Sequence, residues 1–226
     1  MHTWLRENRG FILFLVLFGL FRTGVADWNP IPSGSMRPTL LEGDVVLVNR
    51  LAYDLKLPLT DLVLAHLGEP ERGDIVTFSR PGDGTRLIKR VIGVPGDLVE
   101  MRGKRLYLNG APADYRLQAR FAEPVDGRGE VPALRLRERF AGTGYDVQWL
   151  AGDAPASSFG PLRVPAGHYL MLGDNRDRSA DSRFFGLVPR EALIGRAERV
   201  LVSVAYQEDW SPRLKRFGQS LAASSK

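Results

Sequence analysis

RLIKRVIGVPGD, at residues 86–97, is the stretch that indicates the fold most clearly. Its β-branched apolar residues are typical of a strand, and the Pro-Gly pair that follows is a turn signal. Similar short apolar runs, bounded by Pro and Gly, recur along the chain. They are VVLVN (45–49), DIVTF (74–78), LVEM (98–101), RLYLN (105–109), HYLML (168–172) and RVLVSVAY (199–206). The pattern predicts a mainly β protein built on an antiparallel β-sheet.

Helical patterns are few after the N-terminus. Residues 59–67 have helical spacing, and residues 190–193 fit a single helical turn. Residues 111–160 differ from the rest because Pro, Gly, Ala and Arg dominate and hydrophobic periodicity is weak. We therefore predict a β domain formed by residues 28–110 and 161–226, with a small inserted subdomain at 111–160.

The N-terminus is strongly hydrophobic: residues 11–21 read FILFLVLFGLF. A bilayer core needs about 20 apolar residues, with a lower limit of roughly 17, so Arg22 must reach toward the interface if this segment is to cross. Arg6 and Arg9 precede the segment, which places the N-terminus in the cytoplasm by the positive-inside tendency. We predict a single transmembrane anchor in residues 1–27, with the remaining chain outside.

Two other interpretations of the N-terminus remain open. Gly24-Val25-Ala26 is a small-x-small sequence after an apolar run, as in a cleavable signal peptide. The segment also fits a buried core helix. The anchor and the signal peptide both put the folded part outside the cytoplasm.

The composition narrows the chemistry. The chain has no cysteine, which excludes disulfides and thiolate nucleophiles, and its three histidines lack metal-ligand spacing. We therefore expect no metal and no cofactor. The net charge of +5 does not indicate nucleic acid, because LRLRERF at 134–140 is short and mixed in charge.

A candidate nucleophile lies in IPSGSMRPTLLEGD at residues 31–44. Ser33 and Ser35 flank Gly34 between two prolines, and a nucleophilic serine needs such a stiff, exposed turn. An ordinary polar loop is the alternative, because Ser-Gly-Ser is common in turns.

Lys89 is the candidate base, since it lies within an apolar strand. On a strand, Leu87, Lys89 and Val91 share one face, so Lys89 has apolar neighbours on both sides. Burial would lower the lysine pKa from about 10.4 into the range of a useful base. A lysine that passes an edge strand to reach solvent is the alternative.

A third polar stretch, GDNRDRSADSRFFG, occupies residues 173–186. Such residues cap turns, and Asp181 with Arg183, Arg176 or Arg90 would form ion pairs that fix a loop. A metal is not expected here, because the arginines compete for the carboxylates.

Together these stretches resemble type I signal peptidases. SGSMRPTL (33–40), RGDIVTF (72–78), LIKRVIGVPGD (87–97) and GDNRDRSADSR (173–183) are similar to the successive motifs of that family, and the hydrophobic segment is similar to its anchor. One departure is Asn29, where many members have an aromatic residue.

The resemblance implies roles for particular residues. Ser35 would be the nucleophile and Lys89 the general base, while the Ser33 hydroxyl and the Ser35 backbone N–H would form the oxyanion hole. Ser179 would orient the lysine. The remaining assignments are a structural ion-pair cluster of Arg90, Asp181 and Arg183, and a substrate pocket of Ile31, Leu40, Leu87 and Ile88.

The implied function is that of a serine endopeptidase of the bacterial inner membrane. It would cut signal peptides from exported preproteins after small-x-small sites, with its catalytic domain on the periplasmic side. Its expected partners are signal peptides, membrane lipid and, through them, the secretion machinery, with no nucleic acid. A self-cleaving Ser/Lys repressor and a membrane-tethered β-rich binding module are the rival interpretations.

Overall fold

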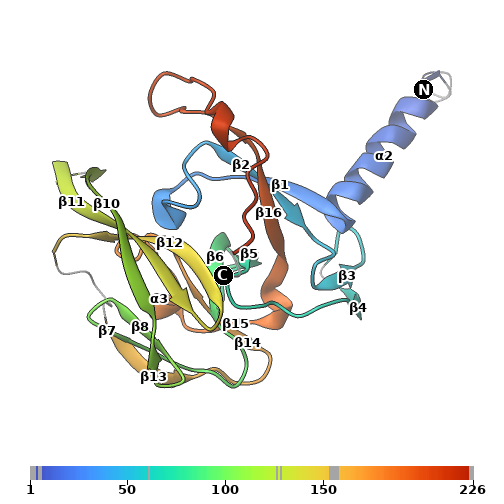
Figure 1. The fold of residues 1–226 in the computed structure, drawn as a ribbon. Coiled ribbons are helices and arrows are strands. Elements are labelled where there is room, and N and C mark those ends of the chain that lie inside the picture. The colour runs from blue at the N-terminus through green and yellow to red at the C-terminus, as the bar shows by residue number, and fades with distance from the viewer. Residues whose placement is uncertain are drawn as a thin grey trace.

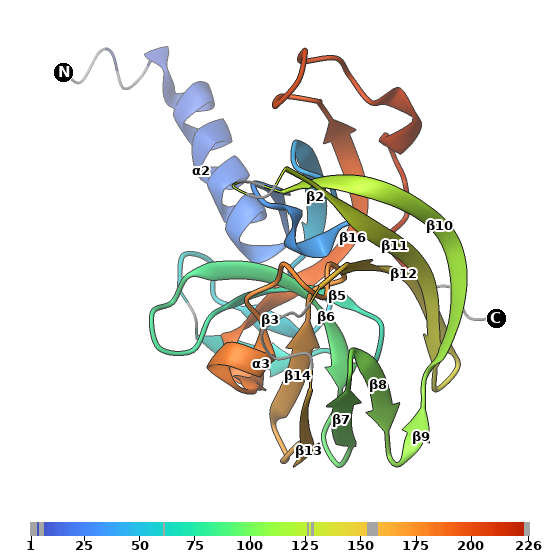
Figure 2. The ribbon, with the colours of Figure 1, turned by 90° about the vertical axis from the view of Figure 1, so that its left-hand side faces the viewer.

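The computed structural model describes residues 4, 7–60, 62–125, 127, 129–152 and 158–223, and its ribbon is drawn in Figures 1 and 2. Its main element is a seven-stranded sheet in which neighbouring strands run antiparallel. In spatial order the strands are β1 (Ala26–Pro30), β2 (Asp44–Asn49), β16 (Leu193–Ser203), β5 (Ile75–Ser79), β6 (Arg86–Gly93), β14 (His168–Leu172) and β15 (Val188–Pro189). The predicted mainly antiparallel β fold is confirmed.

Three smaller sheets surround this one. The first consists of β10 (Asp114–Val125), β11 (Gly129–Phe140) and β12 (Thr143–Leu150). The second consists of β13 (Phe159–Arg163), β7 (Leu98–Arg102), β8 (Arg105–Leu108) and β9 (Ala111–Pro112). The third consists of β3 (Asp54–Lys56) and β4 (Val63–His66). Short helical turns complete the fold: η1 (Gly34–Met36), α3 (Ser182–Phe185), η2 (Arg190–Ala192) and η3 (Leu214–Arg216).

The helix predicted over residues 59–67 is wrong. β4 lies there and pairs antiparallel with β3, with Asp54 opposite His66. Leu59 adopts the left-handed conformation with φ of 65°, which a helix interior does not accept. The single turn predicted at residues 190–193 corresponds to η2.

The weakly periodic segment contains the two longest strands of the chain. β10 and β11, of twelve residues each, pair from Asp114↔Arg139 to Val125↔Gly129. We call residues 114–140 the ribbon; it arches over one side of the molecule in Figure 2. The boundaries proposed for an inserted subdomain remain a prediction.

The N-terminal helix α2 (Arg9–Gly24) has 16 residues and projects from the sheets in Figure 1. The sequence predicts a membrane-spanning helix at this place. Over the described ranges, the structure contains no helix with the length and apolar character required to cross a bilayer.

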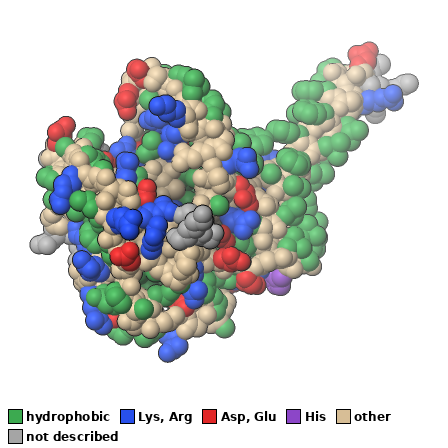
Figure 3. All heavy atoms as spheres, in the orientation of Figure 1, with side chains coloured by type: hydrophobic (Ala, Val, Ile, Leu, Met, Phe, Trp, Pro, Cys, Tyr) green, Lys and Arg blue, Asp and Glu red, His purple; other side chains and the backbone are tan. Residues whose placement is uncertain are grey.

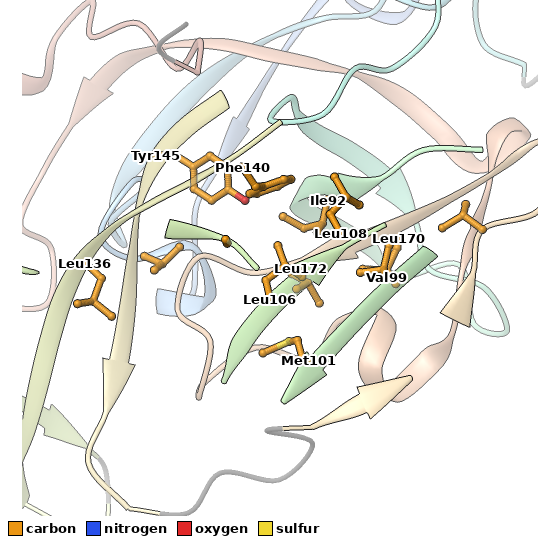
Figure 4. Packing of buried hydrophobic residues seen from close by; sticks show 13 residues of the cluster. Ile92, Val99, Met101, Leu106, Leu108, Leu136, Phe140, Tyr145, Leu170 and Leu172 are labelled. Atoms are coloured by element: carbon orange, nitrogen blue, oxygen red, sulfur yellow. The ribbon is translucent and has the colours of Figure 1, made fainter. Parts of the chain in front are cut away.

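The largest hydrophobic core joins the ribbon to the main sheet. Figure 4 shows Ile92 of β6 and Leu170 of β14 packed with Leu106 of β8 and Tyr145 of β12. Burial of these apolar side chains fixes the first two of the smaller sheets against β6, which carries the candidate base.

A buried polar network crosses the same interface. Glu138 of β11 is fully buried and accepts hydrogen bonds from Arg176 at 2.5 and 2.6 Å, from Tyr115 Oη at 2.6 Å and from Tyr145 Oη at 2.8 Å. The network therefore links the ribbon to the loop at residues 173–186.

We expect Glu138→Gln to lower the free energy of unfolding by roughly 3–5 kcal/mol, because it leaves the buried Arg176 guanidinium without a countercharge. Glu130→Gln is the matched control, since Glu130 is exposed on the same strand. Urea unfolding of both variants measures the difference. Equal stabilities would show that the Glu138 charge has no structural role.

Candidate active site

Ser35 lies in the tight turn η1, between β1 and β2. Its backbone carbonyl accepts a hydrogen bond from the backbone N–H of Asn175 at 3.1 Å, and Asn175 Nδ2 donates to the carbonyl of Gly34 at 3.0 Å. The serine-rich loop and the loop at residues 173–186 are thus bound to each other on both sides of the Ser35 peptide.

Lys89 of β6 points at this turn. Its Nζ lies 2.8 Å from Ser35 Oγ and 2.9 Å from the carbonyl oxygen of Ile88, and only 3% of the residue is exposed. Burial lowers the pKa of Lys89 from 10.5 to about 8. The nearby carboxylates of Asp181 and Asp174 have the opposite effect and raise this pKa, but burial is the larger effect. Near pH 8 the amine is therefore half in the neutral form that can accept a proton.

Ser179 lies close to the pair without bonding to the lysine. It is buried, and its Oγ has no hydrogen-bond partner among the described residues. A Cβ added at Gly173 would clash with Ser179 Oγ and with the backbone carbonyl oxygen of Ser35. Glycine at position 173 therefore allows Ser179 to approach the nucleophile turn.

Of the ion pairs predicted for Asp181, the one with Arg183 is formed, whereas Arg90 has a different partner. Arg183 binds Asp181 at 2.7 and 2.8 Å, whereas Arg90 binds Asp174 at 2.8 and 2.7 Å and does not bind Asp181. Arg90 and Asp174 are both buried. Asp174, which sequence reasoning missed, comes directly before Asn175 and so ties β6 to the loop that holds Ser35.

A cleft of about 510 Å³ opens above the pair. Its lining residues include both candidate catalytic side chains and several charged ones. They are Ser33, Gly34, Ser35, Arg37, Glu42, Leu87, Lys89, Glu123, Pro124, Asn175, Arg178, Ala180 and Gln207.

The predicted substrate pocket is only partly present in this cleft. Leu87 lines it, whereas Ile31 and Leu40 are buried in a core cluster with Met36, and Ile88 packs against that cluster. Ile31 and Leu40 lie in the loop between β1 and β2, and their side chains point into the core, away from the cleft. Glu123 and Pro124 come from the ribbon and were not predicted, since no local pattern indicates a contact across more than 80 residues.

Two strand edges face each other beside the cleft. β1 is the edge strand of the main sheet, and β14 pairs with β6 only from Arg90 to Gly93, beyond Lys89. Arg86, on the other side of Lys89, donates to Asp27 Oδ2 and to Asn29 Oδ1 at 3.2 Å each. An extended peptide can add to such edges through main-chain hydrogen bonds.

A serine hydroxyl beside a buried amine of lowered pKa has the geometry of a nucleophile and its base, the arrangement of a serine hydrolase that works without histidine. The chain matches, over residues 4–202, the family model described as signal peptidase, peptidase S26. It belongs to this family and is a serine peptidase.

Individual relatives agree with this assignment. The chain is 38% identical to a signal peptidase I of Pseudomonas fluorescens over 205 residues, 85% of this chain and 69% of the relative. A signal peptidase I of Pseudomonas aeruginosa is 37% identical over 207 residues, with the same coverage. A crystal structure of a signal peptidase I from Enterococcus faecalis V583 is 33% identical, covers 57% of this chain and 97% of its own, and superposes with a TM-score of 0.34.

Proposed function

We propose that this peptidase cuts signal peptides from exported preproteins after small-x-small sites, using Ser35 as nucleophile and Lys89 as general base. The observation that carries the proposal is the 2.8 Å contact between Ser35 Oγ and the Nζ of a lysine buried to 97%. No cofactor takes part in this chemistry.

In this mechanism the amine of Lys89 carries the proton in both steps of the reaction. Neutral Lys89 takes the proton of Ser35 while Oγ attacks the scissile carbonyl, and the resulting ammonium gives that proton to the leaving amine. Lys89 next deprotonates a water molecule, which attacks the acyl-enzyme, and the proton returns to Ser35. Ser179, buried and unpaired beside the turn, is proposed to orient the amine when substrate is bound.

The substrate is proposed to lie extended along the edges of β1 and β6. Side chains one and three residues before the cut then point to the same face, because alternate residues of a strand share a face. This arrangement explains a requirement for small residues at both positions, with Leu87 as one wall.

Incubation of the full-length protein, solubilised in detergent, with a preprotein that contains Ala-x-Ala tests this proposal. Mass spectrometry of the product should find a new N-terminus directly after the second alanine. A substrate with a bulky residue in place of that alanine is the control and should remain intact. Cleavage of both substrates at another site would contradict the proposed specificity.

Ser33 is proposed to donate its hydroxyl to the oxyanion, because it lines the cleft beside Ser35. Ser33→Ala should lower kcat by about 10²–10³-fold, the usual cost of one oxyanion donor, with a smaller change in KM. Steady-state cleavage of a signal-peptide substrate measures both constants. An unchanged kcat would place Ser33 outside the oxyanion hole.

We also propose that α2 holds the enzyme on the bacterial inner membrane, with residues 28–110 and 161–226 as its catalytic domain in the periplasm and residues 111–160 as an insertion. Hydrophobic side chains cover the projecting helix in Figure 3, and Phe11 and Phe14 are 62% and 58% exposed. Lipid would cover this apolar surface at a gain of about 25 cal/mol per Å².

Cell fractionation tests the membrane proposal. We expect the protein in the membrane fraction, and protease added to spheroplasts should digest the folded domain. A domain protected from that protease would reverse the proposed orientation. Full recovery in the soluble fraction would contradict anchoring by α2.

A further inference from the structure

The far end of the ribbon reaches the catalytic cleft. Glu123 and Pro124, near the end of β10, line the same cleft as Ser35 and Lys89. The end of β10, 88 residues beyond Ser35 in the sequence and 34 beyond Lys89, thus lines the same cleft as these two residues.

This end of the ribbon has little support from its own sheet. β12 pairs with β11 only from Phe140 to Ala133, and the backbone N–H of Ala151 still donates to the carbonyl of Pro132, so residues 129–131 of β11 and their partners on β10 continue as two strands alone. A hairpin of two strands is marginally stable unless it packs on something else. A small apolar cluster of Val125, Ala133 and Leu150 packs beneath it.

Arg37 ties the hairpin to the nucleophile loop. Its Nη1 lies 2.6 Å from Glu123 Oε1, and its Nε lies 2.8 Å from Glu42 Oε2. The side chains of Glu123 and Glu42 are only 6% and 12% exposed. A carboxylate with so little exposure to water is stable in its charged form only when a guanidinium pairs with it. The hairpin therefore stays on the cleft only while Arg37 pairs with Glu123.

We propose that the Arg37–Glu123 ion pair latches the ribbon onto the nucleophile loop, and that Glu123 and Pro124 thereby form a wall of the cleft that limits which polypeptide segment can bind. This inference rests on the proposed function for the nature of the substrate. The latch itself is a property of the fold and can be measured without substrate.

The latch should therefore affect substrate binding and leave the chemical step at Ser35 unchanged. Arg37 lies two residues beyond Ser35, but neither carboxylate of the latch contacts the Ser35 hydroxyl or the Lys89 amine in the described structure. Release of the latch should therefore loosen the substrate wall and leave the proton transfer between Lys89 and Ser35 in place.

Glu123→Gln, which removes the charge and keeps the shape, tests the latch. We expect KM for a signal-peptide substrate to rise about tenfold, kcat to fall by a much smaller factor, and the pH profile to keep its midpoint. Backbone hydrogen exchange at residues 121–123, 125 and 129–131 should become faster in the same variant. Glu130→Gln, at an exposed site on the same ribbon, is the control and should change neither quantity.

A double-mutant cycle separates the latch from a general loss of fold. Arg37→Gln and Glu123→Gln break the same contact, so the double variant should raise KM and speed exchange by less than the product of the two single effects, whereas two unrelated losses would multiply. Unchanged exchange and unchanged KM in Glu123→Gln would overturn the proposal. A fall in kcat with a shifted pH midpoint would also overturn it, because Glu123 would then act on the catalytic pair.

The two proposals fail in different ways. If the wild-type protein cleaves no preprotein while hydrogen exchange still shows the latch, the substrate assignment is wrong and the latch stands. If cleavage occurs as proposed and Glu123→Gln exchanges like wild type, the latch is wrong and the peptidase assignment stands.

Discussion

Lys89→Arg should be as inactive as Lys89→Ala, with no preprotein cleaved above background. Arginine keeps the positive charge and much of the length, but its guanidinium does not deprotonate in this pH range and so takes no proton from Ser35. If Lys89 were needed only for its charge, the arginine variant would work. Single-turnover cleavage with excess enzyme measures the remaining activity.

A second buried lysine provides the control. Lys56 of β3 is also buried and donates to the carbonyl of Leu193 at 2.7 Å, but it does not line the cleft. Lys56→Arg should keep activity within a few-fold of wild type. Turnover by Lys89→Arg comparable to that of Lys56→Arg would show that another group activates Ser35.

The pH dependence follows from the same lysine. Burial lowers the pKa of Lys89 to about 8, and the free amine is the form that acts as base. Activity measured as kcat/KM should therefore be low in acid and rise with pH through a midpoint near 8. A rising limb near 10.4, the value of an exposed lysine, would contradict a buried base.

Ser35→Ala should abolish cleavage and leave the fold intact. Removal of a serine protease nucleophile costs about 10⁶ in kcat. The hydroxyl lost here is half-buried and bonds to Lys89, which keeps its hydrogen bond to the Ile88 carbonyl, so stability should change by about 1 kcal/mol or less.

Two measurements on Ser35→Ala separate catalysis from folding. Its thermal unfolding midpoint should match that of wild type within a few degrees, and it should still bind a preprotein without converting it. Cleavage at the wild-type position by this variant would reject Ser35 as nucleophile. A large loss of stability would mean that the serine is a structural residue.

Local patterns predicted several of the strands and singled out Ser35 and Lys89 as candidates for the site. Apolar runs between Pro and Gly gave β2, β5, β6 and β14, and alternation along β6 placed Lys89 among apolar neighbours. The pairing of Lys89 with Ser35 came from the family resemblance, because nothing in the local sequence shows which strand faces which loop. The roles assigned to Ser33 and Ser179 are still predictions.

Several predictions failed because they concern contacts between residues that are distant in the sequence, and such contacts leave no pattern in the local sequence. Arg90 could be assigned to an ion-pair cluster, but its carboxylate is Asp174, and Arg176 turns to Glu138 on a distant strand. The strands of the ribbon were not predicted, because the arginines and prolines at their solvent-facing positions are not typical of strands. The leucines of residues 59–67 have the spacing of a helix, but the segment forms strand β4 because it pairs with β3.

The order of strands in the main sheet also bears on when activity can begin. β16, the last strand of the chain, lies between β2, which follows the Ser35 loop, and β5, which pairs with the strand of Lys89. A nascent chain still on the ribosome contains both residues well before residues 193–203 emerge to join the two halves of the sheet. We expect the enzyme to stay inactive until residues 193–203 have joined the sheet, because before then Ser35 and Lys89 belong to separate halves of it.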